Sequence, residues 1–299
     1  TEGATSSARV LSIQSTVVHG YVGNKSAVFP LQTLGIEVDP INSVQFSNHT
    51  GYPIFTGHTL DGPQLKELVR GLTENGLIDH THLLTGYMKS PSILRTVVET
   101  LRLLREKNPN TTYFCDPVMG DNGELYVPEE LVPVYRDEVV PLATVLTPNQ
   151  FEAETLTGVT ITSDGDAVTA MDRLHAQGVK IVVITSCVYG SPDSITLVAS
   201  RAGQESQGGG ESRFKICIPK IKASFTGTGD LLAALLLAWL DLTDDLKTSI
   251  ENATTTVQAV LSKTIEAGGR ELRIIQCRSD IVKPSVPEWL RAVPLPEPL

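Results

Sequence analysis

The chain has 299 residues, of which 41% are apolar and 19% are charged, and its formal net charge is −10. This composition is typical of a globular protein and excludes a disordered or collagen-like chain. The acidic balance argues against non-specific binding to nucleic acids or anionic membranes, because no surplus of Lys and Arg is present to neutralise phosphates.

The four cysteines lie far apart, without the CxxC or Cys/His spacing of a zinc site. We therefore expect neither structural zinc nor a disulfide framework. Together with the lack of a basic-then-apolar leader, this favours a reducing, cytoplasmic setting. The longest apolar run, Leu231 to Leu240, is too short for a bilayer, which needs ~20 residues.

Short β-rich runs alternate with longer helical patterns along the chain. Before residue 140, strands are predicted at 9–15, 82–87 and 111–118, helices at 25–34, 63–75 and 90–107, and an extended, turn-rich segment at 36–52. After it, strands are predicted at 141–149, 180–186, 194–200 and 213–221, and helices in NQFEAETL and at 166–178, 229–241 and 245–266. The Gly-rich tract 203–212 is predicted to be a surface loop.

Strands that alternate with helices predict βαβ units. We therefore expect an α/β fold with a mostly parallel central sheet and helices on both faces. No Pro-, Ser- or Gly-rich linker divides the chain, and no internal repeat is found. The prediction is a single domain over residues 1–299, with an irregular, Pro-rich tail from about 268.

Polar side chains follow the ends of several predicted strands. In α/β sheets, ligands bind outside the carboxyl ends of the parallel strands. A polar small-molecule site is therefore expected where these residues meet: Ser15, Tyr87, Asp116, Asp121, Asn149, Glu152, Thr185, Ser186 and the GTGD sequence.

The GTGD sequence precedes the most apolar helix. Gly227 and Gly229 permit a close backbone approach, and free N–H groups at the helix start form an anion hole. Asp230 in the first turn can accept a proton from an attacking hydroxyl while these amides hold a transferred phosphoryl group. A helix-capping aspartate is the alternative. It explains less well the two glycines and the flanking Thr226 and Thr228.

Other motifs leave alternatives open. Asp116 and Asp121 of DPVMGD suit either a magnesium site or a simple turn. Asn149 and Glu152 suit either ligand contacts or a helix capping box. His49 is more typical of a hydrogen-bonding loop residue than of a catalytic base. The chain contains no GxxxxGK[ST], HExxH or GxSxG motif, and GTGDLL lacks the third glycine of a dinucleotide fingerprint.

Taken together, SIQSTVVHGYVGNKSAVFPLQTLG, NSVQFSNHTGY, LLTGY, CDPVMGD, LTPNQFEAETLTG and FTGTGDLLAALLLAW resemble the pyridoxal kinase family of the ribokinase superfamily. The resemblance is collinear over about residues 8–266 and recurs in ELRIIQCRSDI. GTGD marks the superfamily, whereas SIQS, HTGY and LTGY distinguish this branch from sugar and adenosine kinases.

The resemblance implies a ribokinase-like fold and ATP-dependent, direct in-line phosphorylation of the 5′-hydroxymethyl group of pyridoxal, and of pyridoxine and pyridoxamine. It also implies Mg²⁺ or another divalent ion, a monovalent cation (K⁺ or Na⁺) and a homodimer. Two alternatives remain at this point. One is a hydroxymethylpyrimidine-type kinase, and the other is a non-catalytic vitamer-binding protein.

The resemblance also implies residue roles. Asp230 is the expected general base, with Gly227, Thr228 and Gly229 as the anion hole. The implied vitamer contacts are Ser15, Val22, Phe46, Thr50, Tyr87 and Asp230. The implied nucleotide contacts are Asp116, Tyr126, Asn149, Glu152, Thr185, Ser186, Ile221, Lys222, Ala223 and Thr228. The implied cation ligands are Asp116, Asp121, Thr147 and Thr185.

Overall fold

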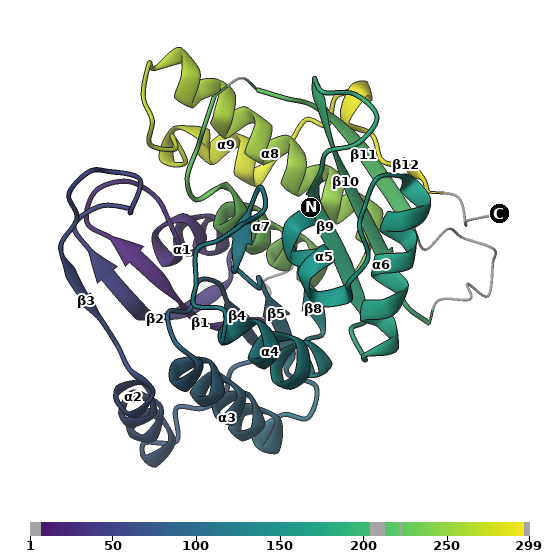
Figure 1. Cartoon of the computed structure of the whole chain (residues 1–299). Helices are drawn as coiled ribbons and strands as arrows, with labels where there is room; N and C mark the ends of the chain where they lie inside the picture. The colour runs from purple at the N-terminus through teal and green to yellow at the C-terminus, as the bar shows by residue number, and fades with distance from the viewer. Residues whose placement is uncertain (1–6, 204–212, 222, 296–299) are drawn as a thin grey trace.

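The computed structural model describes residues 7–203, 213–221 and 223–295, and its centre is a ten-stranded sheet (Figure 1). The parallel strands are β1 (Arg9–Val17), β2 (Glu37–Phe46), β4 (His82–Thr85), β5 (Thr112–Cys115), β8 (Val145–Leu146) and β9 (Ile181–Cys187). The antiparallel strands are β3 (Gly57–Thr59), β10 (Ser194–Arg201), β11 (Arg213–Pro219) and β12 (Val293–Pro294). The spatial order is β12-β11-β10-β9-β8-β5-β4-β1-β2-β3.

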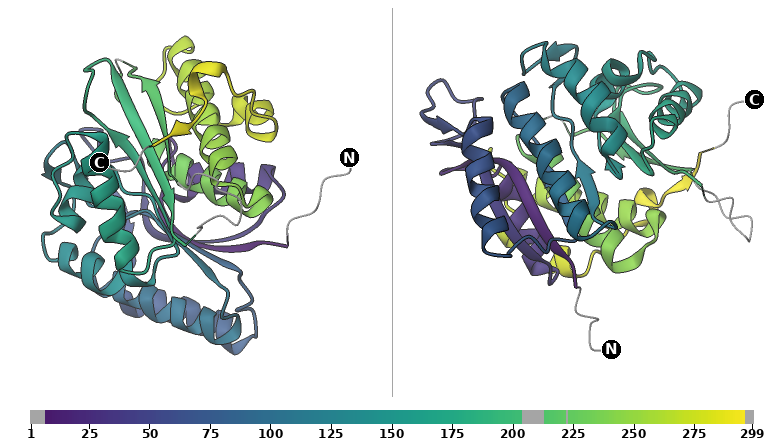
Figure 2. Two further views of the ribbon diagram at one scale, coloured as in Figure 1. Left: turned by 90° about the vertical axis from the view of Figure 1, so that its right-hand side faces the viewer. Right: turned by 90° about the horizontal axis from the view of Figure 1, so that it is seen from below.

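Helices cover both faces of the sheet (Figures 1 and 2). One face carries α2 (Gly62–Glu74), α3 (Pro91–Lys107), α4 (Leu131–Val134), α5 (Gln150–Thr157) and α6 (Asp164–Ala176), whose apolar side chains share one core cluster. The other carries α1 (Asn24–Thr33), α7 (Thr228–Thr243), α8 (Leu246–Glu266) and α9 (Arg278–Val282), which share a second cluster. The predicted fold class, α/β with a mostly parallel sheet and helices on both faces, is confirmed.

Helix α7 lies deepest among the helices of its face. The side chains from Leu231 to Ala238 are all buried, because α7 packs against the sheet on one side and against α1 and α8 on the others. A helix that is apolar all round is stable only in such a core position. The burial of α7 fixes the place of its N-terminus, where the GTGD sequence lies.

Several predicted elements differ in extent from those observed. The strand predicted at 141–149 is limited to β8, because Val140–Leu142 forms a 3-10 turn and Asn149 already caps α5. The strand predicted at 111–118 ends at Cys115 as β5. Strand β3 and a small hairpin, β6 (Gly120–Asp121) with β7 (Glu124–Leu125), were not predicted. The tract 203–212 lies almost wholly outside the described residues.

The C-terminal segment is more ordered than the predicted irregular tail. It contributes α9, two 3-10 turns and strand β12, which pairs with β11 at the edge of the sheet. Buried Glu251 on α8 accepts hydrogen bonds from Arg291 and from the Ala292 amide, at 2.8 and 2.9 Å. Within the described ranges, no helix combines the length and the apolar character needed to cross a membrane.

Candidate active site

The start of α7 depends on a glycine in a left-handed conformation. Gly227 has φ +86°, and a Cβ atom there would lie 2.0 Å from the carbonyl oxygen of Tyr21. Only glycine fits both the conformation and the space. The tight approach of the two backbones brings the first turn of α7 against the loop that follows β1.

Asp230 lies in this first turn and is held by the same loop. The Gly23 amide donates a hydrogen bond of 2.8 Å to Asp230 Oδ2. Burial raises the pKa of the Asp230 carboxyl, and the bond from Gly23 opposes that shift because it favours the ionised form. A partly desolvated carboxylate with a raised pKa is suited to accept a proton. The capping alternative is not supported, because no side chain caps α7.

Two further buried carboxylates belong to the site: Asp116 interacts with Asp230, and Glu152 interacts with Asp116. Burial raises the pKa of Asp116 well above its usual range, and the charges of Glu152 and Asp230 add to that shift. Burial likewise raises the pKa of Glu152 to about 7, although three backbone amides favour its charged form. Two of these amides, those of Met119 and Gly120, donate to Glu152 Oε1 at 2.9 and 3.4 Å. The site therefore concentrates negative charge in a buried place.

Asn149 and Glu152 form the capping box that the sequence allowed as an alternative. The Glu152 amide donates to Asn149 Oδ1 at 2.9 Å, and the Asn149 amide donates to Glu152 Oε2 at 2.8 Å. Asn149 Nδ2 also donates to the Gly120 carbonyl at 2.7 Å. The pair thus fixes the start of α5 and ties it to the DPVMGD segment, whatever else it binds.

The buried acidic cluster is compatible with a divalent cation. Thr147 is buried, and its hydroxyl favours the charged form of Asp116, although no hydrogen bond of normal geometry reaches the hydroxyl oxygen. A free buried oxygen beside repelling carboxylates is a site that a cation would satisfy. In the described part of the chain, no three His, Cys, Asp or Glu side chains are grouped as a complete metal cage. Magnesium, however, is typically held by one or two carboxylates together with substrate phosphates and water.

A cavity of about 420 Å³ opens beside the start of α7. Its polar end contains the predicted residues Asp121, Asn149, Thr185, Ser186, Thr228 and Gly229. Its apolar part contains the predicted Ile221 and Ala223 together with Ile195, Leu197, Ile218, Leu232, Val257 and Leu261. A polar end at a helix N-terminus and an apolar remainder suit a nucleotide, with phosphates at the amides and the base against the side chains.

The other predicted nucleotide residues lie around this cavity or beyond it. Asp116 approaches its edge, since its Oδ2 lies 3.6 Å from the place of a Cβ atom on Gly229. Glu152 is buried behind the DPVMGD segment. Tyr126 is 59% exposed after β7, and Lys222 lies outside the described residues.

The predicted vitamer residues come from three adjacent strands. Ser15 lies near the end of β1, Phe46 ends β2, and Tyr87 follows β4. Val22 and Thr50 lie in the loops that follow β1 and β2. Because parallel strands end at one edge, these residues lie on the same side of the sheet as Asp230.

Two close approaches link the vitamer residues to Asp230. A Cβ atom on Gly23 would lie 2.7 Å from Ser15 Oγ, and one on Gly86 would lie 3.4 Å from Asp230 Oδ1. Gly86 directly precedes Tyr87. The segment from Ser15 to Gly23 and the segment after β4 therefore both border the carboxylate.

Two groups of residues near the site were missed in the sequence. Thr254, Val257, Gln258 and Leu261 of α8 line the cavity of about 420 Å³. Glu271, after α8, contacts His49 and Tyr52 across more than two hundred residues. The heptad-like spacing of the α8 residues indicates only a buried helix face, and ELR was visible only as part of the family resemblance.

The fold and the site together define a class of protein: a phosphotransferase of the ribokinase-like type, with an aspartate at a glycine-rich helix start beside a nucleotide-sized cavity. A family model described as phosphomethylpyrimidine kinase matches residues 58–274. A pyridoxal kinase from Arabidopsis thaliana is 55% identical over 93% of this chain and 92% of its own length. The human pyridoxal kinase is 44% identical, over 93% of this chain and 96% of its own length.

Solved structures agree with these sequence relatives. The structure of pyridoxal kinase from Leishmania donovani in complex with ADP and pyridoxamine has a TM-score of 0.88 and 37% identity, over 96% of this chain and 99% of that chain. Pyridoxal kinase from Entamoeba histolytica has a TM-score of 0.86 and 29% identity, over 96% of this chain and 99% of that chain. The chain belongs to the pyridoxal kinase family.

Proposed function

We propose that this chain is an ATP-dependent kinase that phosphorylates the 5′-hydroxymethyl group of pyridoxal, and also of pyridoxine and pyridoxamine. The observation that carries the proposal is Asp230, held by the Gly23 amide at the start of α7 and beside the 420 Å³ cavity. Family membership supports the acceptor: the Leishmania donovani enzyme was solved with ADP and pyridoxamine, and with ADP and pyridoxine.

In the proposed mechanism, Asp230 is the general base. Its carboxylate accepts the proton of the 5′-hydroxyl group as the oxygen attacks the γ-phosphorus of ATP. The bond between that phosphorus and the β-γ bridging oxygen breaks, and ADP leaves. No covalent enzyme intermediate is needed, because acceptor and donor meet on opposite sides of the transferred group. The pKa of Asp230, raised by burial, makes the carboxylate a stronger base.

The amides at the start of α7 are the proposed anion hole for the transferred phosphoryl group. Gly227, Thr228 and Gly229 begin the helix, so their N–H groups have no partner within it. Thr228 and Gly229 form part of the lining of the cavity, which supports this role. The helix dipole adds to the attraction for the negative charge that develops on the phosphoryl oxygens.

For the cations, we propose Asp116, Asp121, Thr147 and Thr185 as contributing side chains. The mutual repulsion of Asp116 with Glu152 and Asp230 and the free Thr147 hydroxyl support this choice. A bound Mg²⁺ supplies charge neutralisation at the phosphates. A monovalent cation, K⁺ or Na⁺, is proposed as a second requirement. Both requirements are tested by measuring activity after the divalent ion is removed by chelation, and after K⁺ and Na⁺ salts are replaced by Tris salts.

A homodimer and a cytoplasmic location belong to the proposal as well. Support for the dimer comes from apolar side chains around Phe46: Val18 is 68% exposed, Ile54 79% and Phe55 43%. Phe55 packs on Phe46 with ring centroids 5.2 Å apart, and the Val18 amide bonds to the Phe46 carbonyl. Exposed apolar side chains gathered in one place favour contact with another protein surface. Light scattering on the purified chain measures the mass directly.

The activity is tested by following pyridoxal 5′-phosphate formation by absorbance, with wild type and Asp230→Asn. General-base assistance typically contributes 10²–10⁴-fold, so kcat of Asp230→Asn should fall by at least about 100-fold. The KM for ATP should change little, since the cavity is intact. The control is Asp244→Asn, the same change at the exposed C-terminal end of α7, which should retain wild-type turnover. Near-normal turnover by Asp230→Asn would exclude this base.

The same assay discriminates between acceptors. The family model named after phosphomethylpyrimidine kinase covers residues 58–274, so hydroxymethylpyrimidine is a suitable competitor. We expect kcat/KM to be far higher for pyridoxal. Wild-type protein that binds pyridoxal without consuming ATP would favour a non-catalytic vitamer-binding protein instead.

A further inference from the structure

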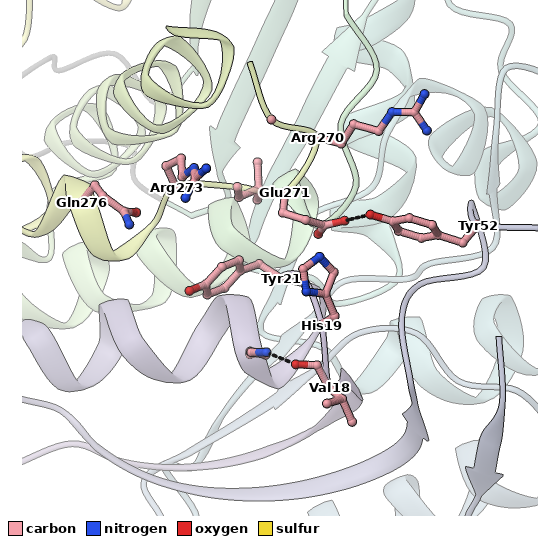
Figure 3. A pocket seen from close by; sticks show the side chains of 12 residues that line it. Val18, His19, Tyr21, Tyr52, Arg270, Glu271, Arg273 and Gln276 are labelled. Carbon is pink, nitrogen blue, oxygen red and sulfur yellow. Dashed lines mark hydrogen bonds between the residues drawn. The ribbon is translucent and has the colours of Figure 1, made fainter. Parts of the chain in front are cut away.

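Glu271 lies between two loops of the candidate active site. Tyr52 Oη donates a hydrogen bond of 2.8 Å to Glu271 Oε1, and His49 Nε2 lies 3.2 Å from the same oxygen. The side chains of Glu271 and His49 are only 19% and 14% exposed. Figure 3 shows Tyr52 pointing at Glu271 beside a cavity of about 460 Å³. The cavity is lined by Tyr52, by residues 18–21 of the loop after β1 and by residues 269–273 of the segment after α8.

The hydrogen bonds of His49 define its role. The Gly51 amide donates to His49 Nδ1 at 3.1 Å, so Nδ1 is an acceptor. The proton of the neutral ring is therefore on Nε2, which donates to Glu271. His49 is a hydrogen-bonding residue of the loop, as its sequence context favoured. Its ring also packs on Tyr52, with centroids 4.8 Å apart.

Glu271 contacts the second loop, which follows β1, through the backbone of that loop. Gly20 has φ +94°, and a Cβ atom there would lie 2.0 Å from Glu271 Oε2. Gly20 thus leaves the space that the carboxylate occupies. Three residues further along, Gly23 donates its amide to Asp230. One carboxylate group therefore meets the loop of His49 and Tyr52 on one oxygen and the loop of Gly20 and Gly23 on the other.

We propose that Glu271 is a positioning residue for the vitamer, which accepts the phosphoryl group. It fixes Thr50, which lies between His49 and Tyr52, relative to the loop that carries Val22 and contacts Asp230. The inference rests on the proposed function, because Thr50 and Val22 are the proposed vitamer contacts. The nucleotide cavity contains none of these residues. Loss of Glu271 should therefore weaken the use of the vitamer and leave ATP binding unchanged.

The kinetic test compares Glu271→Ala and Glu271→Gln with Glu266→Ala, which removes an exposed carboxylate five positions earlier. We expect kcat/KM for pyridoxal to fall about 10-fold to 100-fold in Glu271→Ala, the size typical for losing hydrogen bonds to a charged group. The KM for ATP should stay within about twofold. Glu271→Gln keeps an oxygen that can accept a hydrogen bond, so its kcat/KM for pyridoxal should fall less. Glu266→Ala should match wild type.

Tyr52→Phe provides a second variant that removes one hydrogen bond without removing buried volume. It should lower kcat/KM for pyridoxal in the same direction, and the double variant with Glu271→Ala should be no worse than Glu271→Ala alone, because both changes remove the same interaction. Full additivity of the two changes would overturn the proposal. An equal loss for pyridoxal and ATP, or no loss for pyridoxal, would overturn it as well.

Hydrogen exchange separates this inference from the proposed function. In Glu271→Ala, amides of 18–23 and 47–52 should exchange faster, whereas those of α7 should be unchanged. Unaltered exchange in both loops overturns the positioning role, even if the kinase activity is real. Conversely, wild-type protein without pyridoxal 5′-phosphate formation overturns the proposed function, while faster exchange of the loops would still support the positioning by Glu271.

Discussion

Asp230 combines a pKa raised by burial with a hydrogen bond from Gly23 that favours its ionised form. A base that is merely buried would be protonated and inactive at neutral pH, and one that is merely solvated would be weak. The Gly23 amide supplies the balance without adding a positive charge that would attract the phosphoryl group away from the helix start. At Asp116, burial and the charges of Glu152 and Asp230 disfavour the ionised carboxylate, which supports the cation proposed there.

Glu152 predicts a pH dependence of stability. Its pKa is raised from the ordinary value of 4.5 to about 7, mainly by burial. Between those values the folded protein binds a proton that the unfolded chain has released. The contribution of Glu152 to the free energy of unfolding is therefore full below pH 4.5 and is lost as the pH rises toward 7.

Thermal unfolding measured from pH 5 to pH 8 without added divalent ions tests this dependence. Glu152→Gln should reduce the fall in Tm with rising pH, because the amide does not titrate. Glu106→Gln, at an exposed position, should keep the wild-type slope. If Glu152→Gln also keeps the wild-type slope of Tm against pH, the dependence comes from other groups and the prediction for Glu152 is wrong.

The elements near the site show what local sequence can predict. The start of α7 was predicted from GTGD, because glycine flexibility and helix capping are local effects. The start of α5 was equally readable from Asn149 and Glu152. Strand β8 was overestimated, since a run such as PLATVLTPN contains β-forming residues but only Val145 and Leu146 find partners on both sides.

Long-range contacts could not be predicted in this way. No local pattern connects Glu271 with His49, which lies 222 positions away in the sequence, or places α8 side chains in the nucleotide cavity. Such contacts depend on how whole elements pack, which a periodicity does not specify. The strands that carry Ser15, Phe46 and Tyr87 end at one edge of the sheet, but the individual roles of these residues stay predictions.

The glycine at the start of α7 gives a prediction at the scale of this helix. Gly227→Ala must tolerate φ +86° and a Cβ atom 2.0 Å from the Tyr21 carbonyl oxygen. Gly35→Ala has a similar φ of +82° but open space around the new atom, so it isolates the conformational cost of about 1–2 kcal/mol.

In urea unfolding, Gly227→Ala should therefore lose roughly 3 kcal/mol or more, since displacement of α7 adds to that cost. Its kcat should fall together with its stability, because Asp230 moves with the helix start. Equal destabilisation of the two variants would show that the close approach to Tyr21 is not maintained in solution.

The whole molecule carries a net charge of −10 but is proposed to bind a polyanion. Long-range attraction cannot drive this binding, so local devices must do so: the amides at the start of α7 and the cations proposed at Asp116 and Asp121. The continuity of the sheet bears on the expected single domain. The ten strands form one continuous sheet from β12 to β3, which favours cooperative unfolding.

The C-terminal contact with α8 gives a prediction for global stability. Arg291→Ala leaves the buried Glu251 carboxylate with the Ala292 amide but without its cation, which should lower the free energy of unfolding by about 1–3 kcal/mol. The control is Arg136→Ala, which breaks an exposed pair with Asp137 and should cost less than about 1 kcal/mol. Urea unfolding should give one transition in both variants. Two resolved transitions would contradict the single domain.

The contact between Glu271 and the loop of His49 and Tyr52 also bears on how the chain is made. During translation at about 5–20 residues per second, the segments with Ser15 and Thr50 leave the ribosome well before Glu271. The nascent chain can build much of its central sheet in that interval, but the carboxylate that contacts His49 and Tyr52 emerges only after more than two hundred further residues. Ribosome-bound chains that stop before Glu271 lack this contact, so the order of synthesis places the closing of these loops after the synthesis of α8.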